Sequence, residues 1–130
     1  MERLRERMTV AESALVRLEE VMAIVQPSAM ERDAAIQRFE FTFEAIWKAA
    51  KSFLFEVEGV DLGSPKSVIR SCRETGLLTE NQAVMALKMA DDRNLTVHTY
   101  NEALAVEIYS RLHAYSVLLR CWHEHMQEKM

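Results

Sequence analysis

Apolar residues recur every three or four positions along most of this chain, which is the spacing of one face of an α-helix. In the first segment the apolar stripe continues until Pro27, which is expected to end a first helix. The members of this stripe are Leu4, Met8, Ala11, Leu15, Leu18, Met22 and Val25. Charged residues occupy much of the remaining surface, so this helix is predicted to bury one face.

A longer apolar stripe begins after a helix-start signal. Ser28 and Glu31 form a Ser-x-x-Glu capping box, in which side chains and backbone N–H groups satisfy each other. Gly59 is expected to end the helix, which at about 28 residues would be about 40 Å long. A helix of this length with an apolar seam is typical of a bundle. The stripe comprises Ile36, Phe39, Phe43, Ile46, Ala50, Phe53 and Val57, with Trp47 beside it.

Three further helices are expected in the second half of the chain. Ser64 followed by a proline predicts a short helix over about 65–74. Thr79 and Gln82 form another capping box and predict a helix that ends near Arg93. The expected core side chains are Val68, Ile69 and Cys72 in the short helix, and Leu104, Ile108, Leu112, Tyr115, Leu119, Trp122 and Met126 in the last. The pattern predicts an all-α, up-and-down four-helix bundle with one additional short helix, as a single domain over residues 1–130.

Composition supports this interpretation and narrows the functional classes. The 130 residues include only three Gly and two Pro, and 49% of them are hydrophobic, which favours long helices over many short strands. The formal charge of −4 argues against non-specific binding of bulk nucleic acid. Two cysteines are too few for a disulfide framework. Because no signal peptide or membrane span is evident, we expect a cytoplasmic protein.

Two weak candidates for chemistry have simpler structural explanations. Cys121 and His125 are four residues apart and would share a helix face, but no matching set of further ligands accompanies them, so we expect no metal site and no cofactor. The eight methionines are spaced as core residues, and methionine is a common filler of irregular cores.

The stretch "DDRNLTVHTY" is the stronger candidate, because it lies between two predicted helices. Thr99 and Glu102 form a capping box, so the last helix is expected to start at Tyr100, with His98 just outside its N-terminus. On one continuous helix Arg93 and His98 would lie about 140° apart. A break between them would let the two side chains converge beside an anion-binding helix end.

These residue types suit phosphodiester chemistry without a metal. The imidazole of His98 can accept or donate a proton near neutral pH. The guanidinium of Arg93 can bind phosphate oxygens and stabilise negative charge in a transition state. Asn94 can orient either group through hydrogen bonds.

A purely structural role for the same residues is also open. Arg93 could pair with Asp91, Asp92 or Glu102, and His98 could cap or pack against a helix. An arginine and a histidine at this spacing are a weak signal when considered alone.

The stretch also resembles a known motif. "RNLTVHTY" contains Arg-x4-His-x-Tyr, the signature of HEPN-domain proteins that pair with minimal nucleotidyltransferases. The segments "SPKSVIRSCRETGLL", "DDRN" and "NEALAVEIY" and the Phe/Trp-rich second helix are similar to the nucleotidyltransferase substrate-binding proteins, over roughly residues 8–126. Similar proteins often have a tryptophan in the helix before the motif, where this chain has Val84 and Met85.

The resemblance implies a HEPN-like bundle that forms a homodimer or higher homo-oligomer and has a minimal nucleotidyltransferase as partner. In toxin–antitoxin pairs of this kind, the HEPN protein is a metal-independent ribonuclease. Arg93 and His98 would then be the catalytic pair, Asn94 would support them, and Tyr100 would accept AMP from the partner, which blocks the ribonuclease. The older family name implies a non-catalytic subunit that presents an RNA or nucleotide substrate to the transferase. A helical dimer with a vestigial motif is a third possibility.

Overall fold

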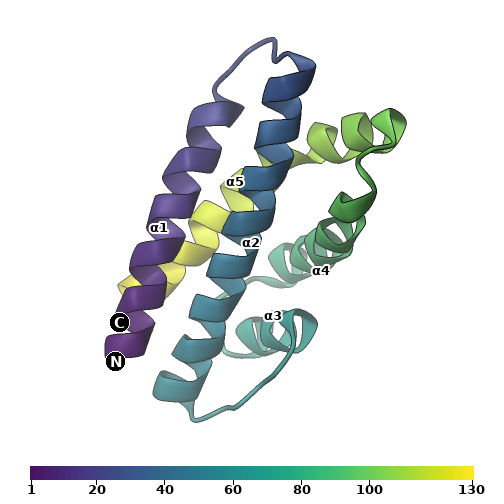
Figure 1. Cartoon of the computed structure of the whole chain (residues 1–130). Coiled ribbons are helices and arrows are strands. Elements are labelled where there is room, and N and C mark those ends of the chain that lie inside the picture. The colour runs from purple at the N-terminus through teal and green to yellow at the C-terminus, as the bar shows by residue number, and fades with distance from the viewer.

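Five α-helices and one short 3-10 turn, η1, make up the computed structural model, which describes all 130 residues and contains no strand. The elements are α1 (Glu2–Met22), α2 (Ala29–Glu58), α3 (Pro65–Glu74), α4 (Glu80–Leu95), η1 (Thr96–His98) and α5 (Glu102–Glu128). Helices α1 and α2 lie side by side, α5 passes behind them, and α3 and α4 lie to one side of this pair (Figure 1). The all-α prediction, with one short helix, is confirmed.

Helix starts agree with the capping signals at three positions. The Ser28 hydroxyl accepts a hydrogen bond from the Glu31 N–H at 3.1 Å, and the Glu31 carboxylate accepts one from the Ser28 N–H at 2.9 Å. Thr79 and Gln82 make the same reciprocal pair at the start of α4. Ser64 caps α3, as predicted. These interactions involve residues three positions apart, so the local sequence is sufficient to specify them.

Two residues of the predicted apolar stripes are exposed to solvent instead of packed in the core. Helix α1 ends at Met22, before Pro27, and its last turn tightens as the Ile24 N–H bonds to the Val21 carbonyl at 3.2 Å. Val25 therefore lies in the connection and is 92% exposed. Val57 lies in the last turn of α2, beyond the helices that cover its middle, and is also exposed.

The core extends through all five helices as one cluster of 33 buried apolar residues. Its largest side chains come from α2 and α5, where Phe39 stacks on Tyr115 with ring centroids 5.6 Å apart and Trp122 is fully buried. Cys72 is also fully buried and brings α3 into the same core. None of the helices is long and apolar enough to cross a membrane.

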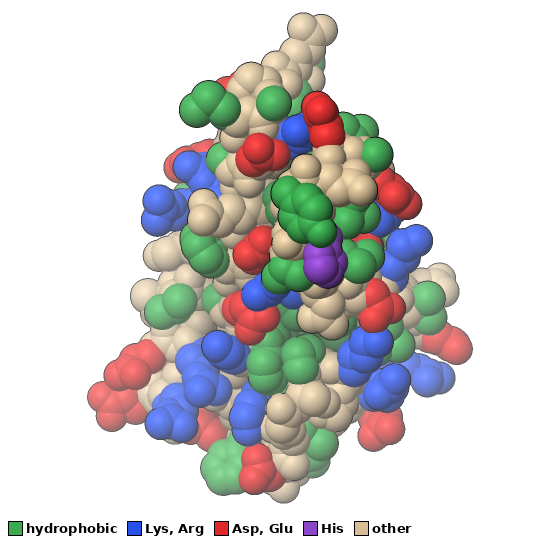
Figure 2. Space-filling model, turned by 45° about the vertical axis from the view of Figure 1, so that its right-hand side comes forward, with side chains coloured by type: hydrophobic (Ala, Val, Ile, Leu, Met, Phe, Trp, Pro, Cys, Tyr) green, Lys and Arg blue, Asp and Glu red, His purple; other side chains and the backbone are tan.

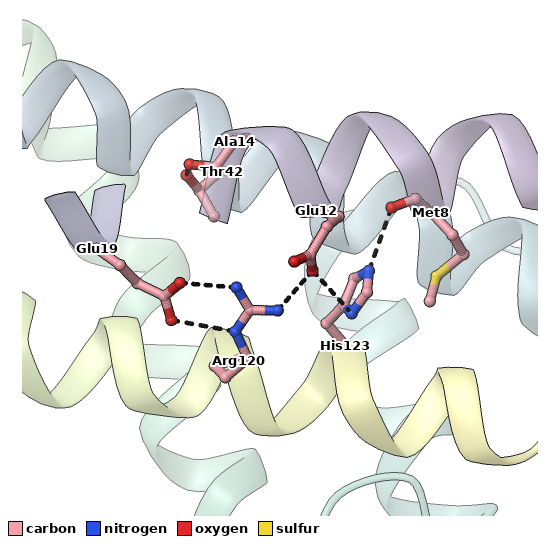
Figure 3. A network of polar contacts seen from close by, with 7 residues as sticks. All are labelled: Met8, Glu12, Ala14, Glu19, Thr42, Arg120 and His123. Carbon is pink, nitrogen blue, oxygen red and sulfur yellow. Dashed lines mark hydrogen bonds and ion pairs between the residues drawn. The ribbon is translucent and has the colours of Figure 1, made fainter. Parts of the chain in front are cut away.

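A polar network fastens α1 to α5 along the surface of the core (Figure 3). Arg120 donates from Nε and Nη2 to the Glu19 carboxylate, at 3.1 and 2.7 Å, and from Nη1 to Glu12 at 2.5 Å. His123 is buried, with Nε2 3.2 Å from the Met8 carbonyl oxygen and Nδ1 3.7 Å from Glu12. Each of these three guanidinium nitrogens therefore has a carboxylate partner.

Candidate functional site

The four residues of the predicted motif lie where α4 ends and α5 has not yet begun. Arg93 and Asn94 occupy the last turn of α4, His98 is the last residue of η1, and Tyr100 lies two residues beyond it. The chain thus breaks between Arg93 and His98, as the sequence predicted. The structure places Arg93 and Asn94 on one helix and His98 and Tyr100 on the turn that leaves it.

The predicted start of the last helix is wrong by two residues. Helix α5 begins at Glu102, and its N-cap is Asn101, whose side-chain oxygen accepts a hydrogen bond from the Leu104 N–H at 3.2 Å. Thr99 closes the 3-10 turn instead, with its hydroxyl donating to the Thr96 carbonyl at 2.8 Å. Its ψ of 2° is unlike the extended conformation that an N-cap requires. Tyr100 therefore lies outside the helix.

Thr96 holds Arg93 at the end of α4. Its hydroxyl donates to the Arg93 carbonyl at 2.7 Å and accepts from Arg93 Nη1 at 3.3 Å. Thr96 is buried, so this contact fixes both the backbone and the side chain of the arginine next to the turn that carries His98.

Glu44 on α2 is a second partner of Arg93. One of its carboxylate oxygens lies 3.3 Å from Arg93 Nε, and the other accepts a hydrogen bond from Trp47 Nε1 at 3.0 Å. The Nε hydrogen does not point well at the carboxylate, so this buried nitrogen has an ion-pair contact without a hydrogen bond. Arg93 Nη2 makes no hydrogen bond within the chain. This nitrogen therefore remains available to donate to an anion.

A groove of about 390 Å³ opens beside Arg93. Asn94 lines it from α4, and Lys66 and Ser64 line it from the start of α3. The Lys66 ammonium also contacts the Asp91 carboxylate at 2.6 Å, which ties α3 to α4. His98 is not among the residues that line this groove, so the structure does not bring all the predicted site residues into one cavity.

His98 and Tyr100 lie at the open surface. Their rings are 6.0 Å apart between centroids and stand nearly perpendicular, at 80°. Tyr100 is 86% exposed, and its hydroxyl makes no hydrogen bond within the chain. Both groups are thus accessible to a large substrate or to another protein.

A buried ion pair next to Arg93 anchors this end of α4 to α5. The Asp92 carboxylate accepts hydrogen bonds from Arg111 Nε at 2.7 Å, from Arg111 Nη2 at 3.0 Å and from the Tyr115 hydroxyl at 2.5 Å. Burial, together with this bond to Asp92, raises the pKa of Tyr115 above its usual range. Sequence analysis offered Asp92 as a partner of Arg93, but the structure pairs it with α5.

Lys66, Glu44 and Asp92 are the supporting residues that the sequence did not assign. Lys66 and Asp92 belong to "SPKS" and "DDRN", which carried the family resemblance, whereas Glu44 had no distinguishing signal. Each forms an ion pair with a residue at least 19 positions away in the sequence, so its role depends on how the helices pack.

Cys121 and His125 have surroundings unlike those of a metal site. His125 Nδ1 lies 2.8 Å from the Leu77 carbonyl oxygen, which requires a proton on that nitrogen. No group of three or more His, Cys, Asp or Glu side chains converges in a way that could hold a metal ion.

Comparison with known proteins gives the family. Residues 6–128 match the family described as "Nucleotidyltransferase substrate binding protein like". The chain is 30% identical over 95 residues to a probable ribonuclease, HepT, of Haemophilus influenzae. That match covers 68% of this chain and 64% of the relative, so the chain spans less than two thirds of the relative's length.

Solved structures of similar proteins have the same fold. A crystal structure of a Thermus thermophilus protein is 53% identical and has a TM-score of 0.87, covering 89% of this chain and 98% of that one. An H. influenzae protein, described as the fold of a substrate-binding domain of a nucleotidyltransferase, has 22% identity and a TM-score of 0.80, covering 92% and 98%.

A more distant structure also shares this fold. It is a tri-AMPylated HEPN toxin of Shewanella oneidensis in complex with its MNT antitoxin, with 14% identity and a TM-score of 0.77 over 96% of both chains. The helical fold, the break after Arg93 and the match over residues 6–128 all point to the same family. The chain belongs to the family of nucleotidyltransferase substrate-binding-like proteins.

Proposed function

We propose that the protein is a metal-independent endoribonuclease and the toxin-like partner of a minimal nucleotidyltransferase. The observation that carries this proposal is the state of the motif residues. His98 is exposed on the turn that follows the helix end carrying Arg93, and Arg93 Nη2 makes no hydrogen bond within the chain. The relative named as a probable ribonuclease supports the same activity.

In the proposed reaction His98 and Arg93 act on one phosphodiester. The His98 imidazole accepts the proton of the ribose 2′-hydroxyl, which attacks the adjacent phosphorus, and a protonated imidazole can supply the proton to the leaving 5′-oxygen. Arg93 stabilises the negative charge that develops on the phosphate oxygens. Asn94, which lines the same groove as Arg93, orients the phosphate by hydrogen bonding.

We further propose that the partner switches the ribonuclease off at Tyr100. The phenol oxygen would attack the α-phosphorus of a nucleoside triphosphate, so that AMP becomes attached and pyrophosphate leaves. Exposure of 86% makes Tyr100 accessible to another enzyme. An added phosphate beside His98 would compete with the RNA phosphate, since the two rings are 6.0 Å apart. Such a system would operate in the cytoplasm, where RNA and nucleotides are found.

A homodimer is part of the proposal. Figure 2 shows a face on which apolar side chains are open to solvent between charged ones. On α4 and the turn, the exposed large apolar side chains are Val84, Met85, Leu95, Val97 and Tyr100. A second copy covering part of this face would enclose the motif in a cleft between subunits. Light scattering at micromolar concentration should give twice the 15.0 kDa chain mass, and a monomeric mass would contradict the dimer.

A second candidate is a non-catalytic subunit that presents substrate to the transferase. It is favoured by the groove, which contains Arg93 and Asn94 but not His98, and by Glu44, which occupies one edge of the Arg93 guanidinium. A nucleotide phosphate could bind at Arg93 without any proton transfer. The H. influenzae structure described as a substrate-binding domain supports this role.

RNA cleavage by the purified protein in EDTA separates the two candidates. The ribonuclease should cleave RNA without its partner, and His98→Ala should abolish cleavage while leaving the helical fold unchanged. His113→Ala is the matched control, because His113 is also exposed and lies on α5 away from the motif. Cleavage that persists in His98→Ala would overturn the catalytic assignment. No cleavage, together with a stable complex with a nucleotidyltransferase, would support the binding subunit.

The proposed modification has its own measurement. After incubation with a minimal nucleotidyltransferase and ATP, mass spectrometry should find AMP additions on the peptide that contains Tyr100. Tyr100→Phe should remain active and unmodified, since it lacks the acceptor oxygen. AMP on Tyr109, or no AMP at all, would contradict the assignment.

A further inference from the structure

A row of hollows follows the seam between α1 and α2, and no motif residue lines any of them. It consists of three hollows of about 380, 230 and 440 Å³. Val10 lines the first and second, and Arg7 lines the second and third, so neighbouring hollows adjoin at a shared side chain. We call this surface the α1–α2 groove.

Two phenylalanines stand in the α1–α2 groove. Phe41 lines the first hollow and Phe55 the third, and each is 58% exposed. They are fourteen residues apart on α2, which places them on nearly the same helix face and about 21 Å apart along it. The core does not require these rings, because the buried face of α2 is already filled by other phenylalanines.

Basic side chains predominate along the same groove. Six cations and three carboxylates line it, a formal excess of +3, whereas the whole chain carries −4. The remaining residues therefore sum to −7. The cations are Arg3, Arg7, Arg17, Arg38, Lys48 and Lys51, and the carboxylates are Glu6, Glu56 and Asp61.

Most of this positive charge is available to a ligand. Arg3, Arg7 and Arg17 have no carboxylate within ion-pair distance. The other three contact carboxylates only at 3.4 to 3.9 Å, with Glu20 and Glu44 reaching in from outside the groove and Asp61 lining it. Exposed contacts of this length contribute little, so a phosphate group could replace them.

Two arginines are held in place across the seam. Arg7 Nη1 donates to the Lys48 carbonyl at 3.0 Å and to the Ser52 hydroxyl at 2.8 Å. Arg38 Nη1 donates to the Arg17 carbonyl at 2.8 Å. Because backbone carbonyls and a hydroxyl carry no net charge, these bonds order the guanidinium groups without neutralising them.

The positive charge and the two phenylalanine rings together restrict which class of molecule could bind in the α1–α2 groove. A second copy docked symmetrically would bring one +3 surface against another, which is unfavourable. An acidic peptide would satisfy the cations but has no need of two exposed aromatic rings. Basic grooves with exposed aromatic side chains are the usual platform for single-stranded nucleic acids, because phosphates meet the cations while bases stack on the rings.

We propose that the α1–α2 groove binds single-stranded RNA, as a track separate from the motif. A strand lying along it would place bases on Phe41 and Phe55 and its phosphates near Arg3, Arg7 and Arg17. The biological meaning of this track rests on the proposed ribonuclease function, for which it would retain the substrate. Binding itself is measurable without cleavage.

Fluorescence anisotropy with a labelled twelve-nucleotide oligouridine tests the track. All measurements use the His98→Ala protein, so that the probe stays intact. Phe41→Ala and Phe55→Ala should each weaken binding about tenfold, as expected for the loss of one stacked base. Arg3→Gln and Arg7→Gln should each lower the slope of log K against log salt concentration by about 0.7.

Two control variants show that the effect belongs to the groove. Arg70→Gln removes an exposed arginine of α3 that has no ion pair, and Val117→Ala removes an exposed apolar side chain of α5. Both should leave the affinity within about twofold of the parent. Oligouridine that carries photoreactive 5-bromouracil should crosslink to peptides containing Phe41 or Phe55, which gives a result independent of any variant.

The outcomes separate this inference from the proposed function. Affinity unchanged by both phenylalanine variants, or crosslinks confined to the motif turn, would overturn the track. A polyglutamate peptide that displaces the RNA, combined with insensitivity to the phenylalanine variants, would assign the groove to an acidic protein. If groove variants lose binding but the wild-type protein does not cleave RNA, the track stands and the ribonuclease function fails.

Discussion

Arg93 with His98, and Arg120 with His123, are two arginine–histidine pairs in different surroundings. At the α1–α5 seam, Arg120 donates three hydrogen bonds to two carboxylates and His123 is buried (Figure 3). At the α4–α5 junction, Arg93 Nη2 makes no hydrogen bond within the chain and His98 is exposed. Residue type alone does not distinguish these pairs, but the number of hydrogen-bonding groups still available does.

The hollow beside the α1–α5 seam shows that the volume of a cavity does not by itself identify a functional site. At about 770 Å³ it is larger than the groove of about 390 Å³ beside Arg93. Its arginine is nevertheless neutralised by Glu12 and Glu19, so an anion would have to displace two carboxylates. We interpret this seam as structural, whereas the junction is the region that we propose to be reactive. The following predictions test that difference.

The largest expected effect is on catalysis at the junction. Arg93→Ala should lower the rate of RNA cleavage about 10²–10³-fold, as expected for loss of one group that stabilises transition-state charge. Urea unfolding should change little, since the Glu44 contact is partly exposed. Arg120→Ala, the matched change at the seam, should leave cleavage unaltered. Equal losses of cleavage in the two variants would remove the distinction between the regions.

Asp92→Ala should have the largest effect on stability. It removes the acceptor of three hydrogen bonds, which leaves the buried Tyr115 hydroxyl unpaired and Arg111 with only its 3.4 Å contact to Glu107. The free energy of unfolding should fall by about 3 kcal/mol, measured by urea titration. Cleavage should also decrease, because Asp92 fixes the helix end that carries Arg93. Full activity in a destabilised protein would show that this anchor does not position the site.

Arg120→Ala should destabilise the protein by about 2 kcal/mol, because three hydrogen bonds between α1 and α5 are lost and Glu12 and Glu19 both lose their cation. Arg120→Lys should recover part of the lost stability, since a lysine keeps the charge but cannot make the bidentate contact with Glu19. Unfolding curves for the three proteins measure both effects. A loss below about 0.5 kcal/mol would mean that the network contributes no more than an ordinary surface ion pair.

The smallest effect at neutral pH is an alkaline dependence of stability. Because the pKa of Tyr115 is raised in the folded protein, its contribution is fully present below its ordinary value of 10.0 and is lost as the pH rises through the folded value. Burial raises the pKa of Cys72 from 9.0 to about 12, against a smaller opposing effect of the nearby Trp122, and acts in the same direction. Tyr115→Phe should therefore show a flatter loss of stability above pH 10 than the parent, measured by urea unfolding at each pH. Identical slopes would exclude this contribution of Tyr115.

Much of the fold could be predicted from neighbouring residues. The capping pairs at Ser28 and Thr79 and the proline after Ser64 depend on contacts within about one helical turn, and all three mark the observed starts. The failure at Thr99 is also instructive. Both Thr99 and Asn101 can cap a helix. Because Thr99 closes the 3-10 turn at Thr96–His98 and is not extended, Asn101 is the N-cap.

The sequence by itself determined the helices, the apolar stripes and the presence of an arginine, an asparagine, a histidine and a tyrosine around one chain break. Only the tertiary structure decided that Glu44 reaches Arg93, that Asp92 pairs with Arg111, and that basic side chains of two helices share one groove. The physical reason is separation along the chain. Capping and periodicity act over a few residues, whereas these contacts join residues at least 19 positions apart and exist only once the helices have packed.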